Sequence, residues 1–510
     1  MSATILTLSW PPKALPGLLF VGFVPLLLYA KFEGWTQKSW LAVYCSFILW
    51  GALTMGWISN LQAPNGIQLL IYMGHLFIPF LMSLPFGLSF ALKRKFPTRS
   101  YYLFLPFFWM AYEYLEQFWE LSFPLLNLGF GLSDFPFLIQ YYEITGVRGG
   151  ALLVLMCNIW IYLLISYWKT PRWKFLLLSG LSCGTLLLGF NYLLWNRAEN
   201  IEVLSSKKIM VFQPNTNSYV EEEVSLPQSM SELDSLLDTM PHADILLTPE
   251  FYLKGSTQRP ILLNDRFRRK QDSLIFSLAN RHKTDLLLGA KVLKVIPKRK
   301  QGPFTRQNRT GDYFNQYNAT LFYKVDGDKP QVYSKNQLIP FMERIPFSAL
   351  YDSENDWPAR WFLHGMNFEK LTPTLFKKGE TSILSVICFE SMFTNYIQQI
   401  IGKSNLIMVS SNEEWAQTNH AGMMIDSYHR TLAITFRKPV VRSSNGGPSS
   451  AFNALGKSVG SNTYGEKSAK IYPITTNSIH SFYASTGDLL GMVSFCFLIY
   501  FSYILIRKRR

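Results

Sequence analysis

Long apolar runs occupy the first 200 residues and one short stretch near the C-terminal end, and the part between them is mixed. The N-terminal part is dense in leucine, phenylalanine, tryptophan and tyrosine. Because a helix needs about 20 mostly apolar residues to cross a bilayer, the pattern predicts seven spans. We expect them at about residues 14–30, 41–58, 69–91, 101–118, 147–167, 174–195 and 489–506. The chain then divides into a transmembrane bundle (1–200), a polar domain (201–486), and a last helix with a basic tail (487–510).

Clusters of lysine and arginine between the spans predict the orientation of the bundle. Short loops rich in these residues stay on the cytoplasmic side of a membrane. One loop carries Lys93, Arg94, Lys95 and Arg99, and a second carries Lys169, Arg172 and Lys174. Two spans separate these loops, so the polar domain falls outside the cytoplasm and the tail at 507–510 inside. The same count places the N-terminus outside, or requires one more span near the start.

The polar domain alternates short apolar runs with helical stretches. We expect strands at 209–214, 244–248, 285–289, 319–323, 382–388, 406–410 and 440–443. Helices are expected between them, for example at 266–281 and 391–402. This alternation predicts an α/β domain with a sheet buried on at least one face. Glycine-rich phosphate loops of the GxGxxG or GxxxxGK[ST] type are absent from the sequence, so nucleotide binding has no support.

Charge and cysteine usage exclude several other classes of function. The net charge is +15, but many basic residues flank apolar runs, and the basic stretch at 298–309 has the character of a solvated loop, so nucleic acid is not expected as a partner. Four of the five cysteines (Cys45, Cys157, Cys183 and Cys496) fall in predicted spans, which rules out a disulfide framework in the polar domain. The seven histidines are scattered and CxxC and HExxH motifs are absent, so we expect no metal and no cofactor.

Three polar residues of the polar domain form a candidate catalytic set. Cys388 and Glu250 each follow an apolar strand, and Lys335 lies in the polar stretch 333–343. A helix from about residue 391 would lower the pKa of the thiol. In acyl transfer, a carboxylate takes the thiol proton, the thiolate attacks a carbonyl, and an ammonium stabilises the oxyanion. Taken singly, the three residues also fit a buried apolar thiol, a solvated loop carboxylate and a surface cation.

Four segments of the polar domain resemble the nitrilase superfamily, whose catalytic residues are Glu, Lys and Cys in this chain order. The stretch 333–347, with Lys335 and Glu343 around Pro340, is similar to the lysine loop of that superfamily. Residues 387–390 resemble its nucleophile turn, and 411–415 and 437–447 resemble two later segments. The resemblance implies an α/β nitrilase-like fold, an αββα sandwich.

The membrane part narrows the resemblance to the bacterial apolipoprotein N-acyltransferase family. Several spans before a nitrilase-like domain and one after it are the layout of that family, which has eight spans. Residues 123–129 and 141–150 are similar to segments of its membrane domain. The resemblance covers nearly the whole chain. It implies a multi-pass protein of the bacterial inner membrane, acting as a monomer, with its catalytic domain on the periplasmic side.

The resemblance also implies an activity and a role for each matched residue. Members of the family move a fatty acyl chain from a phospholipid to the N-terminal amine of a diacylglyceryl-cysteine apolipoprotein, through a ping-pong reaction with a cysteine thioester. Cys388 would be the nucleophile, Glu250 the general base and Lys335 the oxyanion partner. Glu343 would orient Lys335 or assist the base. Further residues would line or support the site, namely Asn318, Phe389, Glu390, Asn412 and Trp415.

The chain departs from the family pattern near the predicted site. Thr248 replaces the tryptophan of a Trp-Pro-Glu motif, Phe389 replaces a tyrosine, and Glu413 replaces an aspartate. A glutamate usual between the late arginines aligns with Thr435. These changes affect substrate preference and leave two alternatives open. One is a membrane-tethered amidase or hydrolase with water as the acceptor. The other is a transporter or lipid-binding scaffold, which predicts loss of catalytic residues that are in fact present.

Overall fold

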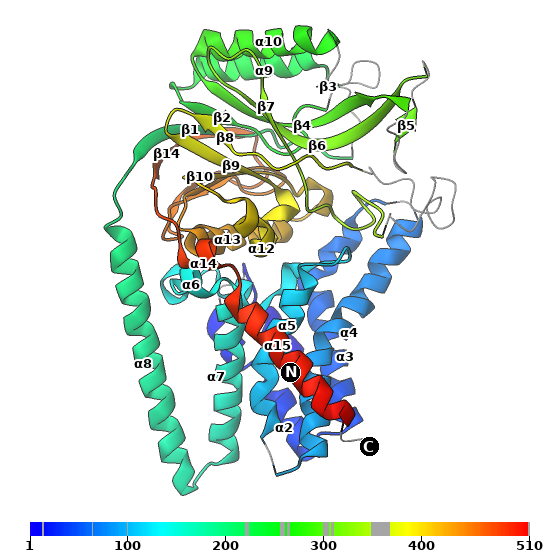
Figure 1. Ribbon diagram of the computed structural model, residues 1–510, viewed down its shortest axis with the longest axis vertical. Coiled ribbons are helices and arrows are strands. Elements are labelled where there is room, and N and C mark those ends of the chain that lie inside the picture. The colour runs from blue at the N-terminus through cyan, green and yellow to red at the C-terminus, as the bar shows by residue number, and fades with distance from the viewer. Residues whose placement is uncertain are drawn as a thin grey trace.

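A helical bundle carries an α/β domain at one end (Figure 1). The computed structural model describes residues 1–12, 15–63, 65–98, 100–219, 224–254, 261–262, 266–298, 305–307, 311–347 and 368–507. Arg99, the end of the tail at 508–510 and most of the predicted loop at 298–309 lie outside the described residues.

Five helical segments in the described part of the chain are long and apolar enough to cross a membrane. They are α3 (Gln37–Met55) with η2 (Gly56–Asn60), α4 (Asn65–Lys95), α7 (Arg148–Ser166), α8 (Pro171–Glu199) and α15 (Leu489–Arg507). Each coincides with a predicted span. The chain is therefore a multi-pass membrane protein.

Two predicted spans are shorter helices than the hydropathy suggests. The first, near 14–30, is divided into η1 (Pro16–Phe20) and α2 (Val24–Phe32). A Cβ at Gly22, between them, would lie 2.4 Å from Leu6 Cδ2, so the helix α1 (Ser2–Ser9) packs tightly against this break. The second, α5 (Leu105–Glu116), has 12 residues and ends where the chain turns beneath the α/β domain. Apolar composition alone does not reveal such breaks, because the turns are apolar too.

The basic ends of the helices lie away from the α/β domain, as the charge pattern predicts. Lys93 and Lys95 close α4, Lys169 lies between α7 and α8, and Arg507 closes α15 (Figure 1). At the opposite end, Trp10 Nε1 donates a hydrogen bond to the Tyr428 hydroxyl in the α/β domain, at 2.8 Å. The chain therefore enters α2 from the side of the α/β domain.

The α/β domain consists of two sheets with helices on their outer faces. The first sheet has the order β14 (Ser468–Thr476), β1 (Ser205–Gln213), β2 (Ile245–Leu247), β4 (Asp285–Ile296), β6 (Tyr313–Tyr323), β5 (Arg306–Gln307), with β3 (Ile261–Leu262) beside β4 and β7 (Gln331–Ser334) beside β6. The second has the order β13 (Ser458–Ser461), β12 (Ser450–Phe452), β11 (Val440–Asn445), β10 (Leu406–Asn412), β9 (Thr381–Ile387), β8 (Phe376–Lys378). Helices α9 (Leu226–Thr239) and α10 (Arg266–His282) cover the first sheet, and α12 (Thr394–Ile400) and α13 (Asn419–Phe436) cover the second (Figure 1). The predicted αββα sandwich is confirmed.

A layer of short helices joins the bundle to the α/β domain. It comprises η4 (Pro124–Leu126), η5 (Leu128–Leu132), η6 (Pro136–Ile139) and α6 (Tyr142–Thr145). Close backbone contact explains its glycines, because a Cβ at Gly129 would lie 2.0 Å from the Val147 carbonyl oxygen. Buried ion pairs fix the layer, with Glu143 accepting from Arg437 at the end of α13, and Arg148 of α7 paired with Asp488.

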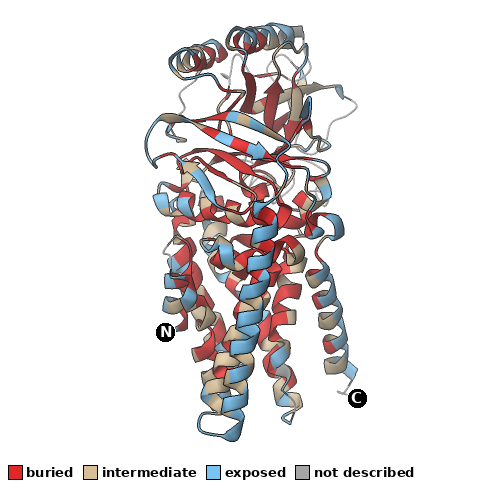
Figure 2. Cartoon of the chain, turned by 90° about the vertical axis from the view of Figure 1, so that its left-hand side faces the viewer, coloured by how far each residue is buried: buried red, intermediate tan, exposed pale blue. Residues whose placement is uncertain are grey.

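One apolar core continues from the bundle into the α/β domain. It includes Trp50 and Trp109 of the bundle together with Phe389 and Met424 of the α/β domain. Figure 2 shows this continuity as buried residues that run through the junction, whereas α8 is largely exposed along its length. The two parts of the chain are therefore held in a defined relation, which matters for a site at their boundary.

Candidate active site

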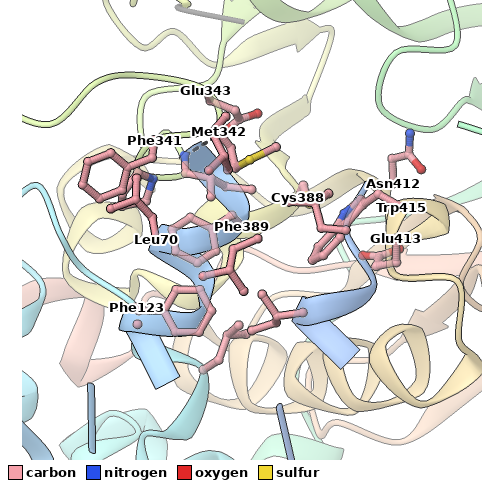
Figure 3. Close-up of a pocket in the computed structure, with 18 of the residues that line it drawn as sticks. Leu70, Phe123, Phe341, Met342, Glu343, Cys388, Phe389, Asn412, Glu413 and Trp415 are labelled. Carbon is pink, nitrogen blue, oxygen red and sulfur yellow. Dashed lines mark hydrogen bonds between the residues drawn. The ribbon is translucent and has the colours of Figure 1, made fainter. Parts of the chain in front are cut away.

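Cys388 lies on a tight turn directly after the buried strand β9. Its backbone φ is 50°, in the left-handed region that residues with a Cβ seldom adopt, and η9 (Cys388–Met392) follows at once. Such a turn projects the side chain beyond the strand end, as in other nucleophile turns between a strand and a helix. The thiol is 6% exposed and faces a cavity (Figure 3).

Glu390 holds this turn against the stretch that carries Lys335. Its carboxylate accepts hydrogen bonds from the backbone N–H groups of Ile387 at 2.9 Å and Asn336 at 2.6 Å. It also accepts from the Tyr333 hydroxyl, at 2.9 and 3.0 Å for its two oxygens. Burial raises the pKa of Glu390 to about 7. Glu390 therefore supports the site from behind, since it is not among the residues that line the cavity.

Glu250, Lys335 and Glu343 form a buried charged cluster beside the thiol. Lys335 Nζ lies 3.0 Å from Glu250 Oε1 and 2.8 Å from Glu343 Oε1. Asn318 Nδ2 donates to the same two oxygens, at 2.6 and 3.1 Å. Glu343 Oε2 accepts from the backbone N–H of Ile339 at 2.8 Å. The structure thus brings together the predicted base, its cation and the two residues predicted to support them.

A close approach of two strands sets the position of Glu250. A Cβ at Gly289 of β4 would lie 2.0 Å from the Pro249 carbonyl oxygen, so a side chain cannot be accommodated there. The hydroxyl of Thr248 accepts from the Gly289 N–H at 3.0 Å. Thr248, one of the predicted departures, is therefore part of the strand junction and is fully buried.

The electrostatics of the cluster differ from the sequence prediction in one respect. Burial raises the pKa of the Cys388 thiol well above its usual value, and the neighbouring Glu250 raises it further, although Lys335 opposes the shift. The prediction that a helix N-terminus lowers this pKa is wrong, because α12 begins only at Thr394, beyond the 3-10 turn. The thiol is therefore protonated at neutral pH and needs a base.

Glu250 has the properties of that base. Burial raises the pKa of Glu250, with Lys335 acting in the opposite direction. Burial alone would lower the pKa of Lys335, but the carboxylates of Glu250 and Glu343 outweigh it and hold that pKa well above the usual value. Lys335 therefore keeps its positive charge, as an oxyanion partner requires.

A second group of residues lies after β10. Asn412 Oδ1 accepts from Ser218 Oγ at 3.1 Å, and the Trp415 ring lies 5.5 Å from the ring of Trp57 in the bundle. Both line the cavity, as predicted, and Phe389 lines it beside Phe123 at a ring distance of 6.1 Å. Glu413, which the sequence marked only as a departure, is fully buried, lines the cavity and pairs with Arg442.

The cavity has a volume of about 980 Å³ and runs from the charged cluster into the bundle. One face of α4 lines it, through Ile67, Leu70, Ile71, Gly74, His75, Ile78 and Pro79. At a rise of about 1.5 Å per residue, this face is roughly 18 Å long. Met73 and Phe77 also line the cavity and are 55% and 43% exposed, so it reaches the outer, apolar surface of the bundle. Sequence patterns did not identify this groove, by which we mean the part of the cavity that runs along the α4 face.

The chain is similar to known proteins over both of its parts. Residues 2–160 match the family model described as the apolipoprotein N-acyltransferase N-terminal domain. An apolipoprotein N-acyltransferase of Chlorobaculum tepidum is 23% identical, with 95% of this chain and 91% of that protein covered. One of Rhodopirellula baltica is 21% identical, with 100% and 97% covered.

Among solved structures, yeast Nit3, a member of branch 10 of the nitrilase superfamily, covers 56% of this chain at 14% identity. Its TM-score is 0.38, and 96% of that structure is covered. A carbon-nitrogen hydrolase of Helicobacter pylori covers 53% of this chain at 11% identity, with 89% of that structure covered and a TM-score of 0.35.

Proposed function

We propose that this chain, a member of the apolipoprotein N-acyltransferase family, transfers a fatty acyl chain from a phospholipid to the N-terminal amine of a diacylglyceryl-cysteine apolipoprotein. One observation carries the proposal. The buried thiol, carboxylate and ammonium of Cys388, Glu250 and Lys335 open into a cavity whose other end is an apolar face of a membrane helix. Such a cavity suits a substrate with a reactive ester at one end and a long hydrocarbon chain at the other.

In the first step, Glu250 takes the proton from the Cys388 thiol and the thiolate attacks an ester carbonyl of the phospholipid. The carbonyl oxygen of the ester becomes an oxyanion, and the Lys335 ammonium stabilises it. The carbon–oxygen bond to glycerol then breaks, Glu250 returns its proton to the leaving alkoxide, and the lysophospholipid departs. The acyl chain remains on sulfur as a thioester. Glu343 and Asn318 keep Lys335 and Glu250 in place through their shared hydrogen bonds.

In the second step, the neutral amine of the apolipoprotein attacks the thioester carbonyl. Glu250 accepts a proton from the attacking nitrogen, and Lys335 again stabilises the oxyanion. The carbon–sulfur bond breaks, the amide forms, and the thiolate recovers the proton from Glu250. Both steps use side chains of the chain itself and need no cofactor.

The dimensions of the groove support a lipid donor. The α4 face that lines the cavity is roughly 18 Å long, and one leaflet holds about 15 Å of hydrocarbon, half of a core about 30 Å thick. A single acyl chain therefore fits the groove along its length. The rings of Phe123 and Phe389 lie 6.1 Å apart and line the same cavity as the thiol, where they offer apolar surface to the first carbons of the chain.

The same proposal places the protein in the bacterial inner membrane, with the α/β domain on the periplasmic side and the protein acting as a monomer. The two apolipoprotein N-acyltransferases reported above come from bacteria, and the basic helix ends lie opposite the α/β domain. Both lipid substrates are then held in the leaflet next to the active site.

The test incubates purified protein with a phospholipid and a synthetic diacylated lipopeptide, and follows both products by mass spectrometry. We expect N-acyl lipopeptide and an acyl adduct on Cys388, and neither product from Cys388→Ala. Release of free fatty acid without N-acyl lipopeptide would support the hydrolase alternative. A full acyl load on the Cys388→Ala protein would refute the assignment of the nucleophile.

A further inference from the structure

A second set of polar side chains, Ser411, Glu413, Arg442 and Ser444, lies near Cys388. Strands β9 and β10 pair in parallel with Ile387 beside Ser410, so Ser411 is the residue of β10 next to the turn on which Cys388 follows β9. A hydrogen bond from the Ser411 side chain acts to lower the pKa of the Cys388 thiol, against the larger effect of burial. Strand β11 continues the row, with Ser444 beside Ser411. The nucleophile is thus flanked by a hydroxyl that the mechanism above does not use.

A fixed carboxylate orients this hydroxyl. Ser411 Oγ donates to Glu413 Oε1, and Ser444 Oγ donates to Glu413 Oε2. Arg442 Nη2 lies 2.7 Å from Glu413 Oε2, and Arg442 Nη1 lies 3.3 Å from Asp426 Oδ1. The side chains of Glu413 and Arg442 are fully buried. A Cβ at Gly447 would lie 2.9 Å from Glu413 Oε2, so the glycine leaves room for the carboxylate.

This arrangement gives the Ser411 hydroxyl two possible states. A hydroxyl has one hydrogen to donate and can accept through its lone pairs. While Ser411 donates to Glu413, it can only accept the S–H of Cys388. Glu413 keeps two other donors, Arg442 and Ser444, so it can release the Ser411 hydrogen without losing all its partners.

We infer that Ser411 is a further catalytic residue, which accepts the Cys388 S–H at rest and turns to donate its hydrogen to the thiolate, while Glu413 and Arg442 position it. The inference rests on the proposed function, since it assumes that Cys388 is the nucleophile. When the thiolate forms, the S–H proton goes to Glu250. Ser411 keeps its own hydrogen throughout, and its hydroxyl rotates so that this hydrogen bonds the sulfur instead of Glu413. In the second step, the same bond stabilises the thiolate as it leaves the thioester.

The charged groups that face the thiol come from four elements. Glu250 follows β2, Lys335 follows β7, Glu413 follows β10, and Arg442 lies on β11. The two carboxylates oppose formation of the thiolate, and the two cations favour it. A hydrogen bond to a charged group is stronger than one to a neutral group, so a donor that bonds only the thiolate lowers the pKa of the thiol.

The test measures the rate at which iodoacetamide alkylates Cys388, by mass spectrometry of the peptide that contains it, from pH 6 to pH 10. We expect Ser411→Ala to be alkylated about tenfold more slowly than wild type at pH 8, with its profile shifted to higher pH. Ser443→Ala is the matched control, because its hydroxyl bonds the Phe212 carbonyl in the same domain, at 2.6 Å. An isosteric pair, Ser411→Thr and Ser411→Val, repeats the comparison at constant volume, and only the valine variant should be slow.

Glu413→Gln should shift the profile in the opposite direction from Ser411→Ala, since it removes a negative charge near the thiol and leaves the hydroxyl free to turn. Equal rates for wild type, Ser411→Ala and Ser411→Val would overturn the inference. Alkylation needs no lipid, so this result is independent of the acyl-transfer test. A Cys388→Ala protein that still carries acyl chains would refute the proposed function instead.

Discussion

Replacing Lys335 with methionine would leave two buried carboxylates facing each other without the ammonium that now lies between them. Lys335 Nζ is 3.0 Å from Glu250 and 2.8 Å from Glu343, and its side chain is fully buried. At an effective dielectric constant of about 20, each pair contributes roughly 6 kcal/mol before desolvation. Because the stranded carboxylates can take up protons, the loss that we expect is smaller, about 3–5 kcal/mol in the free energy of unfolding near neutral pH.

The loss of stability in the Lys335→Met protein should depend on pH. Lys335 at present lowers the pKa of Glu250 against the effect of burial. Without it, the folded-state pKa of Glu250 moves further above the unfolded value of about 4.3. A group with a raised folded-state pKa stabilises the fold below its unfolded pKa and loses that stability as the pH rises through the folded value. The Lys335→Met protein should therefore be closest to wild type at pH 4–5 and furthest from it at pH 8.

Urea unfolding in detergent, followed at pH 5 and pH 8, measures this difference. The double variant Lys335→Met/Glu250→Gln is the control, since it removes the repulsion and should be more stable than the single variant at pH 8. A deficit of the same size at both pH values, or a double variant less stable than the single one, would refute the electrostatic argument. Loss of side-chain packing alone would produce that result.

Two further predictions concern the groove and the nucleophile turn. Ile71→Trp should fill the cavity beside α4 and reduce acylation of Cys388 by a long-chain phospholipid at least tenfold, with a much smaller effect on a short-chain ester. Leu69→Trp, at a position that is 52% exposed and does not line the cavity, should react like wild type, and equal rates for both variants would exclude the groove as the acyl site. Glu390→Gln should reduce the free energy of unfolding by about 1.5–3 kcal/mol for each hydrogen bond to a charged acceptor that is lost. It should also lower the rate at which Cys388 is acylated. Because the pKa of Glu390 is about 7, the deficit relative to wild type should shrink below pH 6, and acylation rates measured at pH 5.5 and pH 8 would test this.

The charged cluster could be predicted from the sequence because each of its residues follows a recognisable local pattern. Glu250 and Cys388 come directly after short apolar strands, β2 and β9, and the packing of their two sheets against each other brings these strand ends to one cavity. The strand prediction at 406–410 falls within β10 for the same reason, and the one at 209–214 overlaps β1, which ends at Gln213. The length of the long antiparallel strands was underestimated. Strand β4 continues to Ile296, through a stretch in which apolar and polar residues alternate and no continuous apolar run is present.

The rest of the site depends on contacts between distant segments. Glu413 and Arg442 are 29 residues apart by number, and only the register of β10 against β11 brings them together. The groove is hidden for a different reason: Ile67, Ile71 and Ile78 have the spacing of an ordinary packing face, and hydropathy does not distinguish a face that meets another helix from one that meets a lipid chain. The raised pKa of Cys388 follows from burial, which the sequence near the thiol did not reveal.

The opening of the cavity beside Met73 and Phe77 has a consequence for the energetics of the proposed reaction. Transfer of a fatty acyl chain from a bilayer to water costs about 0.8 kcal/mol per methylene, which amounts to about 12 kcal/mol for a chain of about 15 methylenes. A substrate that enters sideways from the leaflet keeps its chain in apolar surroundings throughout and does not meet this barrier. Delivery is then a matter of lateral diffusion in two dimensions, and the rate should depend on the mole fraction of donor lipid in the membrane rather than on its concentration in the bulk solution.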